Sequence, residues 1–472
     1  MMQQAASTVV CAPDGGGRRR MLIVTHGYPP AQTNGAELQA QRKVAWWHAR
    51  GHVVRVLAAD PQPATNQPFD TLAEREEVVD GIPVRRLRVA VPDSTRSLRE
   101  TYDHPLLTAA VERELVAFQP DVVYQVSGYL FGTAPLRIAA QHGVATVLFA
   151  MDYWHICQRI TLLRPAGACC PGPRHPADCA ACRLTARAVF AERGPAVQGA
   201  AWRVLARAGG AAPARVGARL GVADFADRQR TIAADLREVA LVVVNSHFLG
   251  ERLAHLGVPR ERLLVVRQGI AAGEFPARAA RQSRDHAGLT VLYLGQISRH
   301  KGTDLAITAV RQLRDAGLPV RLRLHGPLTD TGAYAEQVRA WCDDAAIHLG
   351  APLDRAGVAA ALAAADVLVV PSRWYENSPN VILEAFAAGV PVVAAGHGGM
   401  AEMVRDGVDG LLVQPGDVNA LAGALRRLAT EPGLLARLQA GVRPPYGVDD
   451  ELAGEEAALA ALLGAGARPL DR

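Results

Sequence analysis

The residues best suited to chemistry stand together in one segment that follows a strand and opens a helix. Glu376 lies in the loop and Glu384 on the helix, so that seven residues separate the two carboxylates. Pro379 suits the start of a helix because it has no amide hydrogen to leave unpaired. With the helix dipole, the free amides of Asn380 and Val381 form a site for a phosphate group. A carboxylate one turn deeper can accept paired hydrogen bonds from vicinal hydroxyls such as those of a ribose.

This segment resembles the E-x(7)-E donor-site motif of glycosyltransferase family 4. Three further stretches resemble loops of that family and occur in the expected order, at residues 28–37, 293–302 and 398–402. The resemblance covers most of residues 21–430. It implies an α/β chain of the GT-B fold, in which two Rossmann-like domains face across a cleft, and a retaining sugar transfer from a nucleotide sugar.

The resemblance also implies roles for individual residues. The residues expected to hold the donor are Gly35, Gln296, Lys301, Asn377, Ser378, Pro379, Asn380, Val381 and Glu384. Glu384 would bind the ribose, and Glu376 the sugar. The residues expected to take part in catalysis are Glu376, Lys301 and Asp152.

Lys301 and the helix amides are suited to stabilising the negative charge that develops on a leaving diphosphate. No Asp-x-Asp triplet occurs in the chain, which argues against carboxylates that hold the diphosphate through a cation. We therefore expect no cofactor for catalysis. The chain departs from many relatives at Gln296, where an arginine is common, and Arg299, Arg373 or His300 would have to compensate.

A second departure lies near the expected sugar position. Relatives often carry a histidine before the aspartate that ends an N-domain strand, but here Met151 precedes Asp152. Same-face attack needs no strong enzyme base, because the leaving phosphate can take the acceptor proton, so Asp152 or His155 would orient the acceptor. The alternative is a nucleotide-sugar-binding protein without transfer activity.

Five of the seven cysteines are crowded together, at positions 157, 169, 170, 179 and 182. Cys179 and Cys182 have the C-x2-C spacing that lets two thiolates share one tetrahedral metal, and Cys157 with Cys169 or Cys170 would supply the other ligands. A structural zinc held by Cys157, Cys170, Cys179 and Cys182 is the expectation, with free thiols or an iron-sulfur cluster as alternatives. Some members of the resembled family carry a similar cysteine-bearing insertion.

Composition sets the broad class. The chain has 472 residues, of which 49% are hydrophobic, and 51 basic against 46 acidic side chains. That length favours two or three domains with apolar cores, and the small net charge gives no argument for nucleic acid as a partner. No apolar run reaches the roughly 18 to 20 residues that span a bilayer. The basic residues of the N-terminal stretch follow its apolar part, unlike a secretory signal, so we expect a cytoplasmic protein.

Short β-branched runs alternate with helical periods twice along the chain, as doubly wound parallel sheets require. We expect a disordered leader at 1–20, an N-terminal Rossmann-like acceptor domain at 21–272 with an insertion at about 157–237, a linker at 273–288, a C-terminal Rossmann-like nucleotide-sugar domain at 289–445 and a helical tail at 446–472.

The insertion is rich in Arg and Ala. Its helices could lie on anionic lipid at the inner membrane surface and bring a lipid-linked acceptor to the site, although a solvated helical face is the interpretation we favour. Together these features predict a hexosyltransferase that uses a UDP- or GDP-sugar and a glycan or lipid-linked hydroxyl acceptor in cell-surface glycan or glycolipid biosynthesis.

Overall fold

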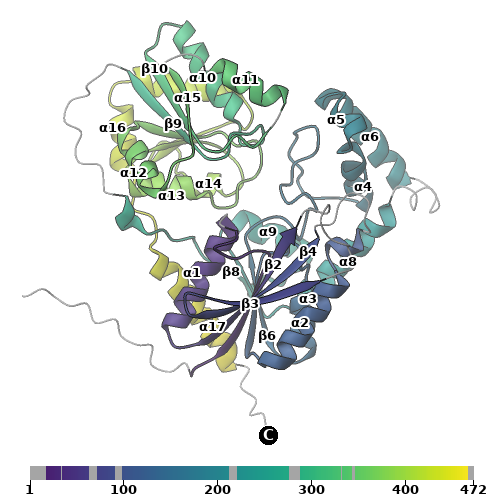
Figure 1. Cartoon of the computed structure of the whole chain (residues 1–472). Coiled ribbons are helices and arrows are strands. Elements are labelled where there is room, and N and C mark those ends of the chain that lie inside the picture. Colours follow the sequence, from purple (N-terminus) through teal and green to yellow (C-terminus); the bar gives the residue numbers. More distant parts are fainter. Residues whose placement is uncertain are drawn as a thin grey trace, which may run out of the picture. The chain divides into compact units, whose positions relative to one another are not determined.

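The chain forms two compact units in the computed structural model (Figure 1). The structure describes residues 17–32, 35–62, 72–90, 98–211, 221–275, 288–330, 332–342 and 346–465. The first unit comprises Met1–Ala150, Ala234–Val242 and Glu455–Arg472, and the second comprises Met151–Ala233 and Val243–Gly454. Most of the expected leader and linker falls at 1–16 and 276–287, outside the described residues.

The first sheet has eight strands in the order β3-β4-β2-β1-β5-β6-β7-β8. The strands are β1 (Arg20–Thr25), β2 (Val53–Gln62), β3 (Ala73–Val79), β4 (Ile82–Ala90), β5 (Val122–Val126), β6 (Ala145–Ala150), β7 (Leu241–Val244) and β8 (Leu263–Val265). Strand β1 pairs in parallel with β2 and β5, so that Ile23 lies opposite both Val56 and Tyr124. The central strands are buried on both faces, which is why they read as continuous apolar runs.

Strand β3 is the one strand that the sequence pattern does not reveal. Its sequence, AEREEVV, is mostly charged and exposed, and it pairs antiparallel with β4 at the edge of the sheet. Charged side chains on an edge strand discourage pairing with other chains, and they also hide the strand from a search for apolar runs.

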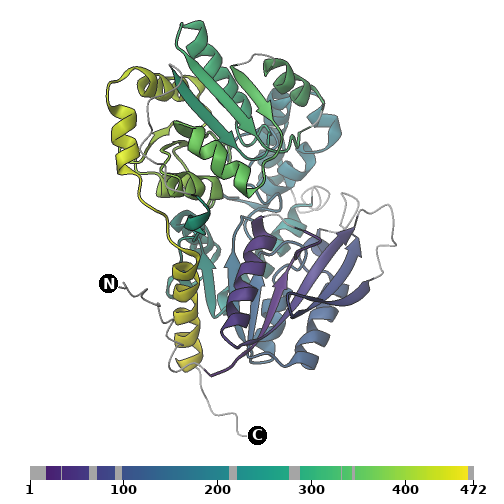
Figure 2. The same ribbon diagram turned by 60° about the vertical axis from the view of Figure 1, so that its left-hand side comes forward.

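Four helices pack on the first unit. They are α1 (Gly35–Ala49), α2 (Pro105–Phe118), α3 (Ala134–Gln141) and α17 (Val448–Ala465), the last of which contributes its part from Glu455 onward. The yellow helix α17 lies beside the purple helix α1 in Figure 2, although about 400 residues of chain separate them. The expected C-terminal tail is therefore helical over its described part.

The second sheet has six strands, all parallel, in the order β11-β10-β9-β12-β13-β14. The strands are β9 (Leu289–Leu294), β10 (Val320–His325), β11 (Ile347–Gly350), β12 (Val367–Val370), β13 (Val392–Ala395) and β14 (Gly410–Val413). In chain order this is the arrangement 3-2-1-4-5-6 of dinucleotide-binding sheets, whose direction of growth reverses between β9 and β12. The predicted pair of parallel α/β domains is confirmed.

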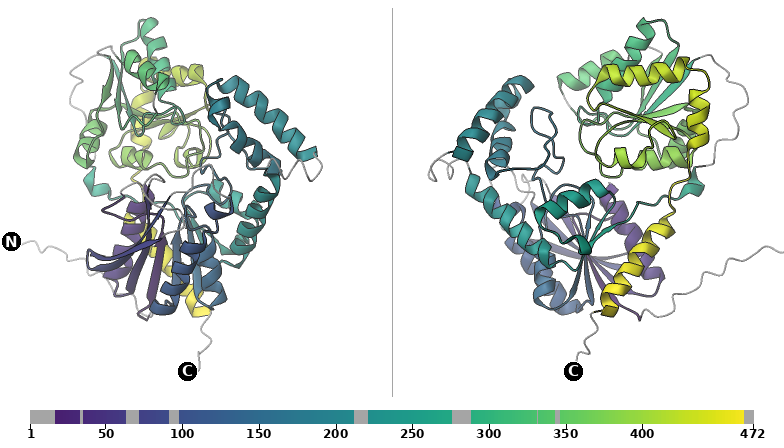
Figure 3. Two further views of the ribbon diagram at one scale, coloured as in Figure 1. Left: turned by 45° about the vertical axis from the view of Figure 1, so that its right-hand side comes forward. Right: turned by 180° about the vertical axis from the view of Figure 1, so that it is seen from behind.

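Helices cover both faces of the second sheet, as the two views of Figure 3 show. One core is closed by α10 (Thr303–Asp315), α11 (Ala333–Trp341), α15 (Val418–Thr430) and α16 (Leu434–Gly441). The other is closed by α12 (Arg355–Ala364), α13 (Asn380–Ala387) and α14 (Met400–Met403). Residues such as Val291 and Leu368 are fully buried between these layers.

Helix α10 begins one residue earlier than the sequence pattern suggests. Gly302, at a φ of 72°, occupies the N-cap position, and Thr303 is the first helical residue. From sequence, Thr303 is the expected N-cap, because threonine is common at that position directly before a helical period, and that expectation is wrong. Its hydroxyl is fully buried and contacts the hydroxyl of Tyr293 and the amide of Ser298, so it fixes the loop before the helix. Only glycine avoids a close approach at Gly302, because a Cβ there would stand 2.1 Å from the carbonyl oxygen of Pro371.

The Arg- and Ala-rich insertion is helical as expected. It contains α4 (Pro176–Thr185), α5 (Ala188–Ala191), α6 (Pro195–Ala211) and α8 (Val222–Glu238), and α9 (His247–Leu256) follows β7. Helices α4 and α6 run side by side in both views of Figure 3, and Trp202 on α6 donates a hydrogen bond to the carbonyl oxygen of Asp178 on α4. No described helix is long and apolar enough to cross a bilayer.

Candidate active site

The second sheet brings the two predicted catalytic loops together. Ligands of open parallel sheets bind beyond the carboxyl ends of the strands, where the strand order reverses. That position lies between β9 and β12, and the loops that follow these two strands carry Lys301 and Glu376. The topology explains why residues 75 positions apart in sequence are in contact.

The carboxylate of Glu376 is fixed through one of its two oxygens. Its Oε1 accepts hydrogen bonds of 2.7 Å from Nζ of Lys301, from the hydroxyl of Ser372 and from the indole Nε1 of Trp374. Oε2 has no hydrogen-bond partner among the described residues. The side chain is only 8% exposed, so the free oxygen belongs to an oriented carboxylate, as a group that binds substrate requires.

Trp374 supports the lysine as well as the glutamate. Nζ of Lys301 lies 4.8 Å from the centre of the Trp374 ring, within range of a cation–π interaction. His300 meets the same ring edge-on, and burial together with the positive charge of Lys301 lowers the pKa of His300. Lys301 is therefore the cation in contact with Glu376, while His300 is a neutral neighbour at physiological pH.

Arg373 is not free to replace the arginine that many relatives carry at the position of Gln296. Both guanidinium nitrogens of Arg373 bind the carboxylate of Asp304 on α10, at 2.6 and 2.7 Å. Arg299 lies over the ring of Tyr334 at 4.7 Å. The side chain of Gln296 is exposed. The main-chain carbonyl oxygen of the same residue accepts a hydrogen bond from the hydroxyl of Tyr293. Lys301 is thus the basic side chain that contacts Glu376 at this edge of the sheet.

Helix α13 begins where the sequence predicts. Pro379 is its N-cap, so that Asn380 and Val381 form the first turn with its free amides. Glu384 lies one turn deeper and is 9% exposed. Burial raises the pKa of Glu384, an effect that Arg355 opposes from 3.4 Å. Both glutamates of the predicted motif are therefore largely buried and oriented by a basic side chain.

Two asparagine side chains of this segment are engaged in holding the loop. Asn377 donates to the carbonyl oxygen of Met151 at 2.9 Å and accepts from the hydroxyl of Ser246 at 2.5 Å. The amide oxygen of Asn380 accepts a hydrogen bond from Gln268. The side-chain oxygens of Asn377 and Asn380 are thus already occupied by hydrogen bonds within the protein.

The segment from Met151 to His155 stands where relatives often carry a histidine, and its residues are buried to different degrees. Met151 is half-buried, and Oδ1 of Asp152 accepts a hydrogen bond from the amide of Trp154. His155 is 2% exposed, and burial together with Arg228 lowers its pKa to about 3. An imidazole in that environment is neutral and out of reach of an acceptor, so the suggestion that His155 orients the acceptor is wrong.

The other predicted donor residue belongs to the first unit. Gly35 is the first residue of α1, and its neighbour Asn34 lies outside the described residues. A role of Gly35 at the donor stays a prediction.

Sequence reasoning missed Ser372 and Trp374, although both lie within four residues of Glu376. Neither has a spacing that distinguishes it from a core residue.

The crowded cysteines are near one another and are half-buried free thiols. Burial, and the proximity of the other thiols, raise the pKa of Cys182 to about 12 and raise that of Cys179 further. Over the described ranges, no group of three or more His, Cys, Asp or Glu side chains is arranged to hold a metal ion. Cys169 instead donates to the carbonyl oxygen of Arg373, 2.8 Å away. Structural zinc at these cysteines stays a prediction.

Known proteins support the fold over nearly the whole chain. Sucrose-phosphate synthase from Thermosynechococcus elongatus superimposes with a TM-score of 0.63 at 18% identity, covering 95% of this chain and 100% of that one. HepE from Anabaena, solved in complex with UDP-glucose, superimposes with a TM-score of 0.59 at 16% identity, covering 94% and 100%. The chain has the GT-B fold of these glycosyltransferases.

Sequence comparison points to the same class. Residues 288–431 match the family model described as Glycosyl transferases group 1. D-inositol 3-phosphate glycosyltransferase 1 from Catenulispora acidiphila is 31% identical over 247 residues, which are 49% of this chain and 56% of that protein. The chain thus spans about half the length of the curated relatives it matches. The family match covers the second sheet, with both Lys301 and Glu376.

Proposed function

We propose that this chain is a retaining, metal-independent glycosyltransferase that moves a hexose from a UDP- or GDP-linked sugar to a hydroxyl acceptor in cell-surface glycan or glycolipid biosynthesis. The observation that carries the proposal is the contact of Lys301 with Glu376 at the switch point of the second sheet, beside the first turn of α13. The family match and the GT-B fold support the same conclusion.

In this proposal the donor is bound by the second unit. The diphosphate lies against Lys301 and the amides of Asn380 and Val381, and the ribose hydroxyls meet Glu384. Oε2 of Glu376 accepts a hydrogen bond from the sugar. The ammonium group and the amides stabilise the charge of the departing diphosphate without reorganising. The leaving phosphate takes the acceptor proton, so Met151 in place of a histidine does not prevent transfer.

In the same proposal, the acceptor is bound by a different part of the chain from the donor. The N-terminal Rossmann-like domain would supply the acceptor surface, and Asp152 would orient the acceptor hydroxyl. The alternative function is binding of a nucleotide sugar without transfer, which the Met151 departure permits. Incubation of the purified protein with UDP- and GDP-sugars decides between them, because release of nucleoside diphosphate shows turnover, whereas binding without release supports the alternative. UDP-glucose comes first, since HepE has the same fold and was solved with it.

The two glutamates should separate turnover from binding. Glu376→Gln should lower turnover by about 100-fold, because it weakens a contact proposed for the reacting sugar, with little change in nucleotide affinity. Glu384→Gln should weaken nucleoside diphosphate binding by about tenfold, because a charged acceptor for the ribose becomes neutral. Calorimetric titration and initial rates measure the two effects. Equal nucleotide affinity in wild type and both variants would contradict the assignment.

Structural zinc at Cys157, Cys170, Cys179 and Cys182 remains a proposal of the sequence pattern alone. Metal analysis of the purified protein tests it directly, and substoichiometric zinc and iron would remove it.

Contact of the insertion with anionic lipid is a further proposal, supported by exposed Arg203 and Arg207 on α6. Flotation with anionic liposomes tests it, and protein absent from the lipid fraction would favour a solvated helical face.

A further inference from the structure

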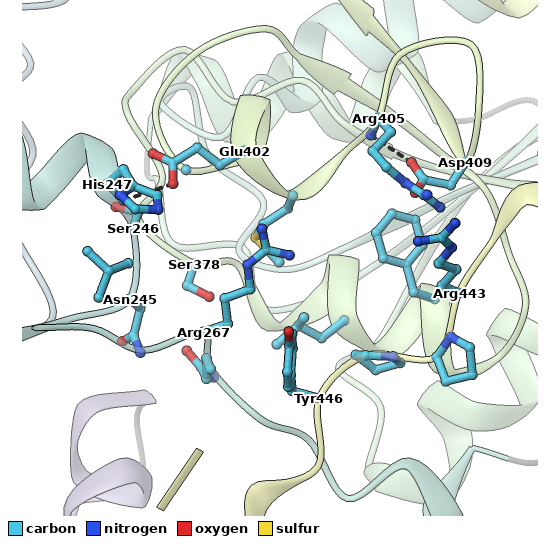
Figure 4. A pocket seen from close by; sticks show the side chains of 18 residues that line it. Asn245, Ser246, His247, Arg267, Ser378, Glu402, Arg405, Asp409, Arg443 and Tyr446 are labelled. Carbon is cyan, nitrogen blue, oxygen red and sulfur yellow. Dashed lines mark hydrogen bonds and ion pairs between the residues drawn. The ribbon is translucent and has the colours of Figure 1, made fainter. Parts of the chain in front are cut away.

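A cavity lies within the second unit, beside the helix of the candidate donor site. Its volume is about 370 Å³, within the size range of small-molecule sites. Its walls come from the segment after β7, the end of β8, helix α13, the stretch around α14 and the residues that precede α17 (Figure 4). Lys301, Glu376 and Glu384 do not line it, and Ser378 is the one residue it shares with the proposed donor set.

The two carboxylates of this cavity both accept hydrogen bonds from the protein. Glu402 accepts hydrogen bonds from the amides of His247 and Phe248, at 2.8 and 2.6 Å, and so caps the N-terminus of α9. Asp409 accepts from the amide and from Nε of Arg405, at 2.7 and 2.6 Å. Figure 4 shows both interactions as dashed lines at the margins of the cavity. Each of the four carboxylate oxygens therefore already accepts a hydrogen bond.

Two arginines of the cavity have no such partner. Arg267 and Arg443 form no hydrogen bond or ion pair with any described residue, and both are labelled among the side chains that line the cavity in Figure 4. The hydroxyls of Ser378 and Tyr446 are also without a hydrogen-bond partner among the described residues. The unpaired groups of the cavity thus include two positive charges and two hydroxyl groups.

The remaining wall is apolar. It is formed in part by Val265, Leu383, Phe386, Met403 and Pro444. A ligand that fits both parts has an anionic head and a small organic body. We propose that this cavity binds a small phosphomonoester. A phosphomonoester carries nearly two negative charges at neutral pH, which the two unpaired guanidinium groups match, and guanidinium forks bind phosphate oxygens in pairs.

This site goes beyond the proposed transfer reaction. Leu383 and Phe386 belong to α13, the helix that also carries Glu384, but they stand on the side of the helix that faces this cavity. A phosphomonoester here therefore occupies space separate from Lys301 and from the ribose carboxylate. The two sites can be distinguished by variants that change only one of them.

Calorimetric titration of the full chain with glycerol 3-phosphate tests the proposal, with glycerol and inorganic phosphate as parallel probes. We expect glycerol 3-phosphate to bind and glycerol not to bind. The double variant Arg267→Ala/Arg443→Ala should weaken binding by at least about tenfold, because each arginine donates charge-assisted hydrogen bonds. Equal or tighter binding of inorganic phosphate would show a simple phosphate site and overturn the phosphomonoester assignment.

Two controls separate this cavity from other sources of binding. Arg339→Ala removes an exposed, unpaired arginine of α11, outside the cavity, and should keep wild-type affinity. Lys301→Ala removes the cation of the donor site and should also keep it. Loss of binding in Lys301→Ala but not in the double variant would place the probe in the donor site and overturn the proposal, as would the absence of any binding by wild type. Since Arg267 and Arg443 are exposed and unpaired, the double variant should keep the wild-type melting temperature, and Arg443→Gln provides a second, milder variant.

Discussion

At the scale of the residue, the candidate site depends on how Glu376 is held. Three donors converge on one oxygen of its carboxylate, and two of them, Ser372 and Trp374, come from the same loop. Donors placed in this way reduce the number of orientations that the carboxylate can adopt, so the second oxygen keeps one position. Both residues act through Glu376 and are therefore positioning residues.

Trp374→Phe should lower turnover by about tenfold while the affinity for nucleoside diphosphate stays unchanged. The variant removes the indole donor to Glu376 but leaves an aromatic ring beside Lys301, and the loss of one hydrogen bond to a charged group has this size. Ser372→Ala should behave in the same way. Initial rates at saturating donor, together with calorimetric titration, measure the split. A change in affinity with normal turnover would show that Trp374 serves the nucleotide instead.

At the scale of the element, the loop after β13 packs against the donor segment at van der Waals distance. The amide of Gly399 donates to the carbonyl oxygen of Glu376 at 2.7 Å. A Cβ on Gly399 would stand 1.6 Å from the carbonyl oxygen of Asn377. The loop can come this close only because Gly399 has no side chain, and its closeness keeps Glu376 and α13 in their places.

Gly399→Ala should lower the free energy of unfolding by about 2–3 kcal/mol, since an added methyl group in a packed region forces the backbone apart. It should also reduce transfer activity, because the displaced main chain carries Glu376. Urea denaturation measures the first effect. Gly396→Ala is the matched control in the same loop, where the added Cβ would meet nothing closer than 3.4 Å. Similar losses in both variants would argue against the packing explanation.

At the scale of the whole molecule, the two ends of the described chain meet inside the first unit. Lys43 on α1 and Glu455 on α17 form an ion pair that is 0% and 2% exposed. The hydroxyl of Tyr124 donates to the other oxygen of Glu455 at 2.7 Å, and Nζ of Lys43 lies 4.0 Å from the centre of the Phe149 ring. The last helix is therefore part of the core of the first unit.

Lys43→Met should destabilise the protein by about 3–5 kcal/mol, because it leaves the charge of Glu455 buried without compensation. Lys43→Met/Glu455→Gln should recover much of that loss, since the neutral amide still accepts from Tyr124. The neighbouring pair of Arg50, directly after α1, and Glu456 on α17 is 24% and 21% exposed, so Arg50→Met should cost about 1 kcal/mol or less. Chemical denaturation of the four proteins gives the comparison, and a double variant as unstable as the single one would contradict it.

The alternation of strands and helices and the start of α13 at Asn380 could both be predicted from the sequence, because burial on both faces and helix-start chemistry leave local patterns. The sequence left β3 hidden, since an exposed edge strand has no apolar period. It also could not show that Arg373 is bound to Asp304, that His155 is sealed from solvent, or that Glu455 returns to Lys43. These facts depend on contacts between residues far apart in the chain. Only tertiary packing decides which charges meet, and for the same reason the unpaired arginines beside α13 could be recognised only in the folded protein.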